Sequence, residues 1–335
     1  MKTKIYFCSL PNGYFGSASN SWDTLSVERL ASSFNTDIYD VEFISVTDIL
    51  HIDFHTKDVL IYTSFFNDEV RSYLKDILYF VKDECLVIPS YEILLAHENK
   101  GFQEVIRRRA NIDNLQSDYV FDLEQIKLSP PFVLKTVGGS GSLGVELIKT
   151  EDELQGVKDK YNRVPIKRTM KNFIRSKQLP DENYQLYAYF YKPFKRFVTQ
   201  SFVEDLSCDY RILIVAHRLY AMRRDVRDGD FRASGSKKFR YNNAPTVLLD
   251  YAEALFQKLN NPFISMDLAL KDGKPYLIEF QGTNFGSSVI RKSSGYYVKQ
   301  HDQWSFIEED PLLEETLSLG LLNYVMKKTA EVPVS

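Results

Sequence analysis

Three features are scarce in this sequence of 335 residues: cysteine, long apolar runs and net charge. The three cysteines, Cys8, Cys85 and Cys208, are scattered and form no Cys-x-x-Cys pair, which argues against a disulfide framework and a zinc site. No uninterrupted apolar stretch approaches the ~20 residues that a membrane span requires. The net charge of −3 gives no overall attraction to nucleic acid or anionic lipid. We therefore expect a soluble, cytoplasmic protein with no nucleic-acid and no membrane partner.

The composition is that of an ordinary globular protein, with 44% apolar and 26% charged residues and room for two or three modest domains. In the first hundred residues, short apolar runs alternate with stretches of helical spacing, which is typical of a parallel sheet with right-handed crossovers. The strands expected there are Lys4–Leu10, Asp40–Ile44, Val59–Tyr62 and Leu86–Ile88. The expected helices are Trp22–Phe34 with Ser21 as N-cap, Asp68–Val81 and Lys100–Ala110.

After Pro130-Pro131 the pattern changes from crossovers to paired strands. A glycine-rich loop joins Phe132–Thr136 to Val145–Lys149, and Asp272-Gly273, a preferred two-residue hairpin turn, joins Phe263–Leu270 to Pro275–Gln281. Further strands are expected at Phe197–Val203, Tyr210–Ala216 and Leu219–Arg224, and helices at Pro165–Lys177, Asp181–Tyr191, Thr246–Leu259 and Leu312–Lys327. The pattern predicts an α/β protein whose N-terminal parallel sheet is followed by α+β regions.

The segment from Phe132 to Val145 carries four glycines and two serines between β-rich flanks. Such a loop leaves backbone amides unshielded, so anionic oxygens can approach them closely, and Lys135 on the preceding strand would offset phosphate charge. The loop lacks Gly-Lys-Ser/Thr and leads into a strand, which excludes a P-loop and a Rossmann fingerprint. Two interpretations stay open: a phosphate cradle, and a flexible hairpin with an incidental lysine.

Oxygen-bearing side chains gather at the second expected hairpin. Asp267 lies on its first strand and Glu279 on its second, with Gln281 and Asn284 close behind. Carboxylate and amide oxygens are ligands that suit Mg²⁺ or Mn²⁺. A water-facing strand edge is the alternative, but it explains less well why Glu279 is embedded in the apolar run Tyr276–Phe280. We predict a metal site here.

Arginines recur on the strands between these two motifs. Arg211 follows Cys208-Asp209-Tyr210, Arg224 ends Met222-Arg223-Arg224, and Arg232 lies within Asp228–Gly235. An arginine fork binds phosphate or carboxylate through two parallel hydrogen bonds, and charge develops on such groups in phosphoryl transfer. A solvated strand edge is the simpler interpretation of any one arginine, whereas the group as a whole favours a site.

Taken in this order, the motifs resemble the ATP-grasp superfamily of carboxylate–amine ligases, within it the branch of D-alanine–D-alanine ligase and of the ligases that add glutamate to ribosomal protein. The resemblance extends from about Leu95 to Ile290. It implies the α/β (α+β) ATP-grasp fold, in which an N-terminal domain (1–95) precedes two subdomains (96–200 and 201–335) that clasp ATP. The glycine hairpin would be a lid of the first subdomain, and the metal site would belong to the second.

The resemblance also implies residue roles on the nucleotide side. Lys135 and the earlier Lys100 would contact phosphates, and the backbone of a hinge after residue 199 would contact adenine. Glu204 would bind the ribose hydroxyls. The full set assigned to nucleotide binding is Lys100, Lys135, Gly138, Gly139, Ser140, Gly141, Ser142, Gln200, Phe202, Val203, Glu204 and Asp209.

For the chemistry, the resemblance implies that arginines stabilise the γ-phosphate and the acyl intermediate. Those matched are Arg211, Arg224 and Arg232, with Arg223 as an alternative to Arg224. The matched metal ligands are Asp267, Glu279 and either Gln281 or Asn284, because Glu279-Phe280-Gln281 stands where the family usually has Glu-x-Asn. A second departure is Ala233-Ser234 in place of an asparagine. Neither change removes a charge, so we retain the ligase interpretation.

The implied activity is ATP- and Mg-dependent activation of a carboxylate as an acyl phosphate for attack by an amine. Two alternatives stay open: a kinase on the same fold with an alcohol acceptor, and a nucleotide-binding module without turnover. The expected partners are a small-molecule, peptide or sugar-acid carboxylate and an amine. Their identity is not evident, although specificity is expected from the Asn12–Ser21 loop and from Ser287, Ser288, Arg291 and Lys292.

One further segment is basic and aromatic. Between Arg163 and Arg196 nine lysines and arginines are interleaved with aromatic residues. We interpret it as a solvated helical face that covers nucleotide, with binding to an acidic polymer or nucleic acid as the alternative. The sequence carries no sign of oligomeric state, for which a homodimer is the default expectation.

Overall fold

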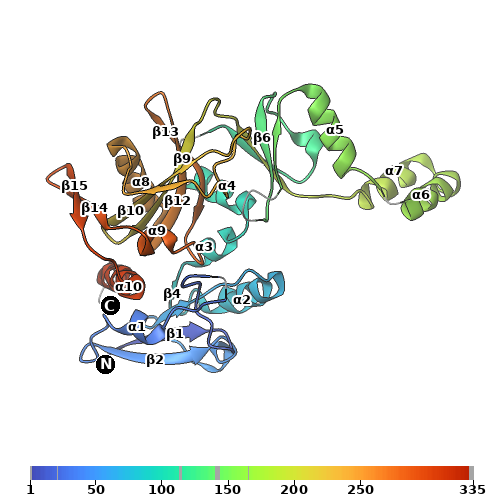
Figure 1. Ribbon diagram of the computed structural model, residues 1–335. Coiled ribbons are helices and arrows are strands. Elements are labelled where there is room, and N and C mark those ends of the chain that lie inside the picture. The colour runs from blue at the N-terminus through green and yellow to red at the C-terminus, as the bar shows by residue number, and fades with distance from the viewer. Residues whose placement is uncertain (1, 21, 113–114, 140–143, 165, 332–335) are drawn as a thin grey trace. The chain divides into compact units, whose positions relative to one another are not determined.

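The computed structural model describes residues 2–20, 22–112, 115–139, 144–164 and 166–331 (Figure 1). The chain divides into two compact units, one formed by Met1–Asn114 with Val203–Ser335 and the other by Leu115–Phe202. The second unit overlaps the subdomain expected at 96–200. The three-part division with its first boundary at residue 95 stays a prediction.

The first unit begins with the expected parallel sheet. Its strands run in the order β2-β1-β3-β4, every neighbouring pair is parallel, and one core packs them against α2. The strands are β1 (Thr3–Ser9), β2 (Tyr39–Ser45), β3 (Val59–Tyr62) and β4 (Leu86–Ile88), and the helical elements are α1 (Val27–Ala31), η1 (Ile49–His51), α2 (Asp68–Val81), α3 (Tyr91–Ala96) and α4 (Lys100–Arg109). The α/β character predicted for this region is confirmed.

The helix expected from Trp22 to Phe34 is much shorter than predicted. Only α1 is helical, and its N-cap is Ser26, whose side chain accepts a hydrogen bond from the Arg29 amide. The proposed cap Ser21 lies outside the described residues. Before α1, a bridge between Ser17 and Thr24 holds the chain in an extended turn, because this local pairing competes successfully with a weak helical periodicity.

A larger antiparallel sheet forms the rest of the first unit, in the order β13-β12-β9-β10-β14-β15, with β11 on β10. Its elements are β9 (Cys208–Val215), β10 (Arg218–Asp225), β11 (Phe239–Tyr241), α8 (Thr246–Leu259), β12 (Phe263–Lys271), β13 (Lys274–Gln281), α9 (Ser288–Arg291), β14 (Gly295–Gln300), β15 (Gln303–Glu308) and α10 (Leu313–Glu331). The β12–β13 hairpin turns on Asp272 and Gly273, both at positive φ, as expected for this turn.

Each face of this sheet belongs to a different core. On one face Ile212, Met266 and Leu268 pack with α8. On the other face Leu213 and Val215 join α10 and the first sheet. The period-two alternation of strand side chains therefore assigns every residue of β9, β10 and β12 to one face or the other.

The hairpin β14–β15 was not expected from the sequence. Its turn residues His301 and Asp302 both have positive φ. Non-glycine residues adopt that conformation infrequently, and His-Asp is not the Asn-Gly or Asp-Gly signal that marks such turns.

The second unit is a four-stranded sheet of order β5-β8-β6-β7 with three helices. Its elements are β5 (Ser117–Val120), η2 (Leu123–Gln125), β6 (Phe132–Thr136), β7 (Val145–Ile148), α5 (Glu151–Tyr161), α6 (Ile166–Gln178), α7 (Asp181–Phe190) and β8 (Phe197–Ser201). Strands β6 and β7 are antiparallel, so the predicted glycine hairpin is confirmed. Leu154 and Val157 of α5 pack on Phe132 and Leu134 in its core. Over the described part of the chain, no helix combines the length and apolarity needed to cross a bilayer.

His97 is buried where α3 ends, in the first unit. Its Nδ1 lies 2.7 Å from the Ser64 hydroxyl oxygen. Burial, with repulsion from Arg71 and Lys75, lowers the pKa of its imidazole to about 3. The side chain is therefore neutral in the folded protein at neutral pH.

This neutral histidine predicts acid-sensitive folding. The unfolded chain takes up a proton near the ordinary histidine pKa of ~6.5, whereas the folded chain does so only near pH 3. The free energy of unfolding should therefore fall between pH 6.5 and 3, by at most about 1.4 kcal/mol per pH unit from this group. Urea titrations at several pH values should show a steeper fall for the wild type than for His97→Gln. The same dependence of the free energy of unfolding on pH in both proteins would contradict a buried, neutral His97.

Candidate functional site

An acidic and basic cluster lies on the α10-facing side of the large sheet. Asp209 and Arg211 of β9 alternate with Tyr210 and Ile212, which belong to the opposite, α8-facing core. In register, Arg224 of β10 stands opposite Asp209, and Asp267 of β12 stands opposite Arg211. The strand pairing therefore brings together four residues that the sequence analysis assigned to the site.

The four side chains form one continuous ion-paired chain. Arg211 binds Asp267 through two parallel bonds, Nε to Oδ1 at 2.7 Å and Nη2 to Oδ2 at 2.9 Å. Arg224 binds Asp209 in the same way, at 2.6 and 2.8 Å. Its Nη2 also lies 2.9 Å from Asp267 Oδ2. Asp267 is thus held between two guanidinium groups.

The electrostatics of the cluster keep its central pair charged. Burial alone raises the pKa of the Asp267 carboxyl, but Arg211 and Arg224 overcome this effect and hold that pKa well below its usual range. Burial lowers the pKa of Arg224, and the two carboxylates more than reverse the change. Both groups are therefore ionised at neutral pH. Their ion pair offsets the free energy that is lost when each charge is removed from water.

Removing the shared arginine should leave the buried Asp209 carboxylate without its bidentate partner and Asp267 with Arg211 alone. We expect Arg224→Met to lower the free energy of unfolding by about 3–5 kcal/mol. The neighbouring Arg223→Ala is the matched control, because Arg223 pairs with the half-buried Asp225 and such pairs contribute about 1 kcal/mol or less. Urea unfolding of both variants measures the difference. Equal destabilisation by the two substitutions would contradict the paired arrangement.

A β-bulge places Glu279 beside this cluster. The register of β12 on β13 shifts between Asp267 and Leu268, so that Glu279 opposes Asp267 while Leu277 opposes Leu268. The extra residue Ile278 allows Leu277 and Phe280 both to enter the core while Glu279 lies on the other face. The bulge explains how an acidic residue stands within an apolar run.

Lys100 approaches the same carboxylate from α4. The helix is capped by Asn99, and the side-chain oxygen of Gln103 accepts a hydrogen bond from the Phe280 amide at 3.3 Å. This contact fixes α4 against β13, so that Lys100 Nζ lies 3.8 Å from Glu279 Oε1. A basic residue assigned to phosphate and an acidic residue assigned to metal are therefore neighbours.

The two amides that compete as metal ligands lie in different surroundings. Gln281 is on β13 opposite Ser265, two residues from Glu279 and hence on the same face. Asn284 follows the strand, and its Oδ1 already accepts hydrogen bonds from the hydroxyls of Tyr14 (3.3 Å) and Ser17 (3.2 Å). Among the described residues no three His, Cys, Asp or Glu side chains converge as a metal site. Both Asp267 oxygens are bound by arginines, so a cation would rely on Glu279 and Gln281 together with ligand oxygens, and the metal role of Asp267 stays a prediction.

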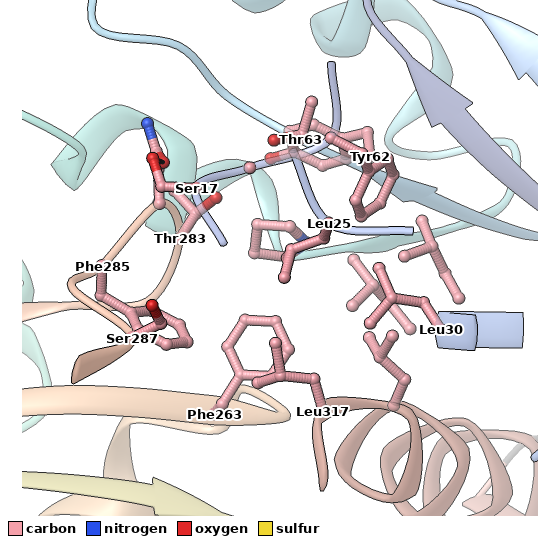
Figure 2. Close-up of a pocket in the computed structure, with 17 residues that line it drawn as sticks. Ser17, Leu25, Leu30, Tyr62, Thr63, Phe263, Thr283, Phe285, Ser287 and Leu317 are labelled. Atoms are coloured by element: carbon pink, nitrogen blue, oxygen red, sulfur yellow. Dashed lines mark hydrogen bonds between the residues drawn. The ribbon is translucent and has the colours of Figure 1, made fainter. Parts of the chain in front are cut away.

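A pocket opens where residues 15–17 meet the segment after β13 (Figure 2). Besides the contacts of Asn284, the Ser287 hydroxyl donates to the Ala18 carbonyl. The hollow is mainly apolar, with hydroxyls on one side. Its lining includes Ser17, Leu25, Leu30, Thr63, Pro89, Phe263, Thr283, Asn284, Phe285, Ser287 and Leu317. It adjoins the carboxyl ends of β3 and β4, where ligands of parallel sheets usually bind.

In the second unit, the predicted phosphate lysine lies deep in the sheet. Lys135 on β6 is opposite Val198 of β8, and Gln200 is two residues further along β8 on the same face. Lys135 Nζ donates to Gln200 Oε1 at 2.7 Å, and both side chains are buried. The side-chain oxygen of Gln200 is thus bound to Lys135, and its backbone lies within β8 between β5 and β6, so the hinge role of Gln200 stays a prediction.

The ends of the glycine loop are locally constrained. The Thr136 hydroxyl donates to the Gly138 carbonyl at 3.0 Å. Gly144 has φ of +71°, and a Cβ there would lie 2.1 Å from the Thr136 hydroxyl oxygen, so the position requires glycine. Gly139 also has positive φ. The tip residues Ser140, Gly141 and Ser142, assigned to phosphate binding, lie outside the described residues.

The remaining predicted residues lie at boundaries and in loops. Phe202 ends the second unit, and Val203 begins the return to the first. Glu204 lies in an exposed turn. Arg232 is in the loop after β10, where its Nη2 lies 2.7 Å from Asp230 Oδ2. The roles of these residues in ligand binding stay predictions.

The bulge at Ile278 and the hydrogen bond from the Phe280 amide of β13 to Gln103 were missed from the sequence. The mutual pairing of Arg211, Arg224 and Asp267 was also not foreseen, although alternation along β9 and β10 carries that information. A β-bulge leaves no comparable signal in the sequence pattern, because its position depends on how the strand pairs with its neighbour and which side chains are buried there.

Residues 90–243 match the family model of the RimK-like ATP-grasp domain, whereas no curated protein matches the sequence significantly. The ATP-grasp ligase PsnB, solved with precursor peptide PsnA2 and AMPPNP, is 12% identical with a TM-score of 0.52, over 97% of this chain and 98% of that one.

Two further solved structures are similar over nearly their whole length. A RimK domain ATP-grasp protein from Sphaerobacter thermophilus is 12% identical with a TM-score of 0.50, over 96% of this chain and 99% of that one. D-alanine–D-alanine ligase from Bacillus anthracis, complexed with ATP, is 13% identical with a TM-score of 0.50, over 98% and 97%. The chain therefore has the ATP-grasp fold, as the motifs predicted, and its residues 90–243 are similar to the RimK-like ATP-grasp domain.

Proposed function

We propose that this chain is an ATP- and Mg²⁺-dependent ligase, which activates a carboxylate as an acyl phosphate and joins it to an amine. The observation that carries the proposal is the grouping of Lys100, Glu279 and Asp267 with two arginines on one face of a sheet in a chain of ATP-grasp fold. Cation-binding oxygens beside phosphate-binding cations are what phosphoryl transfer requires.

The residues present fit a magnesium ion. Glu279 and Gln281 would hold it, and the ATP phosphates would supply further ligands; Asp267 would border the ion, because both of its oxygens are bound by arginines. When bound, the ion would offset negative charge on the phosphate oxygens. We favour Gln281 over Asn284 because Asn284 is engaged with Tyr14 and Ser17.

In the proposed reaction, an oxygen of the substrate carboxylate attacks the γ-phosphorus of ATP. A new P–O bond forms, the bond to the β-phosphate oxygen breaks, and ADP leaves. The amine nitrogen then attacks the acyl carbon, the C–O bond to phosphate breaks, and the nitrogen loses a proton. Lys100 and the arginines would offset the charge that spreads over the transferred group. In the second unit, Lys135 and the glycine hairpin would bind ATP phosphates.

The pocket beside Asn284 is the proposed determinant of specificity. Its apolar lining fits an apolar part of one substrate, and the hydroxyls of Ser17 and Thr283 fit a polar group at the edge (Figure 2). The substrates proposed are a small-molecule, peptide or sugar-acid carboxylate and an amine.

Trapping with hydroxylamine tests the proposal without knowledge of the natural amine. An acyl phosphate reacts with hydroxylamine to give a hydroxamate, so a panel of carboxylic acids with ATP should yield hydroxamate and ADP together. Lys135→Met and Glu279→Gln should each lower the rate by about 10²–10³-fold. The exposed Lys149→Ala and Glu308→Ala are matched controls and should retain activity.

The outcomes separate the alternatives. A phosphorylated alcohol with no hydroxamate would indicate a kinase. ATP binding without ADP release, with any acid and amine, would indicate a binding module. Undiminished hydroxamate formation in both Lys135→Met and Glu279→Gln would show that the site is wrongly assigned.

The choice of amide ligand makes a separate prediction. Gln281→Ala should raise the Mg²⁺ concentration needed for half-maximal hydroxamate formation by roughly tenfold or more. Asn284→Gly preserves the positive φ of 48° and should leave the Mg²⁺ requirement unchanged while raising the KM of a substrate. The reverse pattern would assign the metal to Asn284.

A further inference from the structure

The helices α6 and α7 form a pair in the second unit (Figure 1). Arg168 closes the pair, since its Nη1 donates to the Tyr191 carbonyl at 3.3 Å and its guanidinium lies 5.0 Å from the Tyr191 ring. After α7, Lys192 binds Asp122 at 2.6 Å. No residue of α7 is buried, so the pair is tied to the unit mainly at its base.

Large apolar side chains of both helices are exposed. On α6, Met170, Phe173 and Ile174 are 64%, 66% and 51% exposed, and on α7, Leu186, Tyr189 and Phe190 are 70%, 56% and 76% exposed. Residues three and four apart share one helix face, so the three on α6 form a single apolar stripe. Exposed apolar groups gathered in this way mark an interaction surface.

The same surface is strongly basic. Helix α6 carries five lysines and arginines and no acidic residue. Between residues 166 and 196 there are eight basic and two acidic residues, a net charge of +6. The whole chain carries −3, which leaves −9 on the rest. The positive charge is therefore concentrated in this segment.

The basic side chains are arranged around the apolar stripe. Lys167, Lys171 and Arg175 follow one another at four-residue intervals, which places them along one side of α6. Lys177 lies toward the stripe, and its Nζ is 5.9 Å from the Phe173 ring. Its aliphatic stem can thus cover apolar surface while the ammonium reaches a polar boundary.

We propose that the α6–α7 pair binds the surface of an anionic lipid bilayer. A helix with Phe and aliphatic residues on one face and Lys or Arg on the other lies in the interface between headgroups and acyl chains, and needs no spanning segment. A second copy would cover the apolar stripe but would bring two clusters of like charge together. A nucleic acid would satisfy the cations but leave Met170, Ile174 and Leu186 without an apolar partner. The proposal differs from the expectation of no membrane partner, which no observation on the described residues contradicts.

Sedimentation with vesicles tests the proposal. We expect the full chain to bind phosphatidylcholine vesicles that contain about 30 mol% phosphatidylglycerol at least about tenfold more tightly than pure phosphatidylcholine vesicles. Lys171→Gln/Arg175→Gln should weaken binding by roughly 25-fold, about fivefold for each charge. Phe173→Ser/Ile174→Ser should also release the protein, and added salt should weaken binding of the wild type.

Matched controls separate this surface from general effects. Lys127→Gln/Lys149→Gln removes two exposed charges elsewhere in the same unit, and Phe80→Ser removes an exposed aromatic residue of α2; both should bind vesicles like the wild type. Thermal melting checks that the α6 variants remain folded. Equal binding to neutral and anionic vesicles, or vesicle binding unchanged in both α6 variants, would overturn the proposal. Self-association or RNA binding through this surface, without binding to vesicles, would also overturn the proposal.

Discussion

The Asp267 carboxylate held between Arg211 and Arg224 is the contact on which the site depends. Each of the three residues lies on a different strand of the large sheet, so the ion pairs require the register of β9, β10 and β12 to be correct. Burying these charges costs free energy, which their mutual pairing offsets. Because Asp267 stands opposite Glu279, the same strand register also positions the Glu279 carboxylate, which lies near Lys100. Charged side chains fixed in this way can stabilise negative charge that develops in a transition state without having to move.

Much of the fold follows from periodicity. Strand β3 and helices α2 and α8 begin and end where the apolar pattern indicates, and the Asp272-Gly273 turn forms as its residue types require. The failures have local causes. Near Trp22 the sequence has helical spacing, but the pairing of Ser17 with Thr24 prevents the helix. Before β15 the positive φ of His301 and Asp302 has no signal in residue type.

The side-chain contacts within the site were harder to predict from the sequence than the strands that carry them. Residue types identified Lys100, Lys135, Asp267 and Glu279 as candidates. Their partners depend on tertiary contacts. The amide of Gln200 binds Lys135 because β8 pairs with β6, and the bulge at Ile278 exists because Leu277 and Phe280 must both be buried. The different surroundings of Gln281 and Asn284 likewise become evident only in the folded structure, where Tyr14 and Ser17 bind the Asn284 side chain.

Oxygen transfer is the most direct test of the proposed chemistry. If the carboxylate attacks the γ-phosphorus, one of its oxygens leaves with phosphate when the amine displaces the acyl group. With an acid labelled with ¹⁸O in both carboxylate oxygens, mass spectrometry should find one ¹⁸O in each phosphate released. Phosphate that carries no ¹⁸O, formed at the same rate as the amide, would contradict activation through an acyl phosphate.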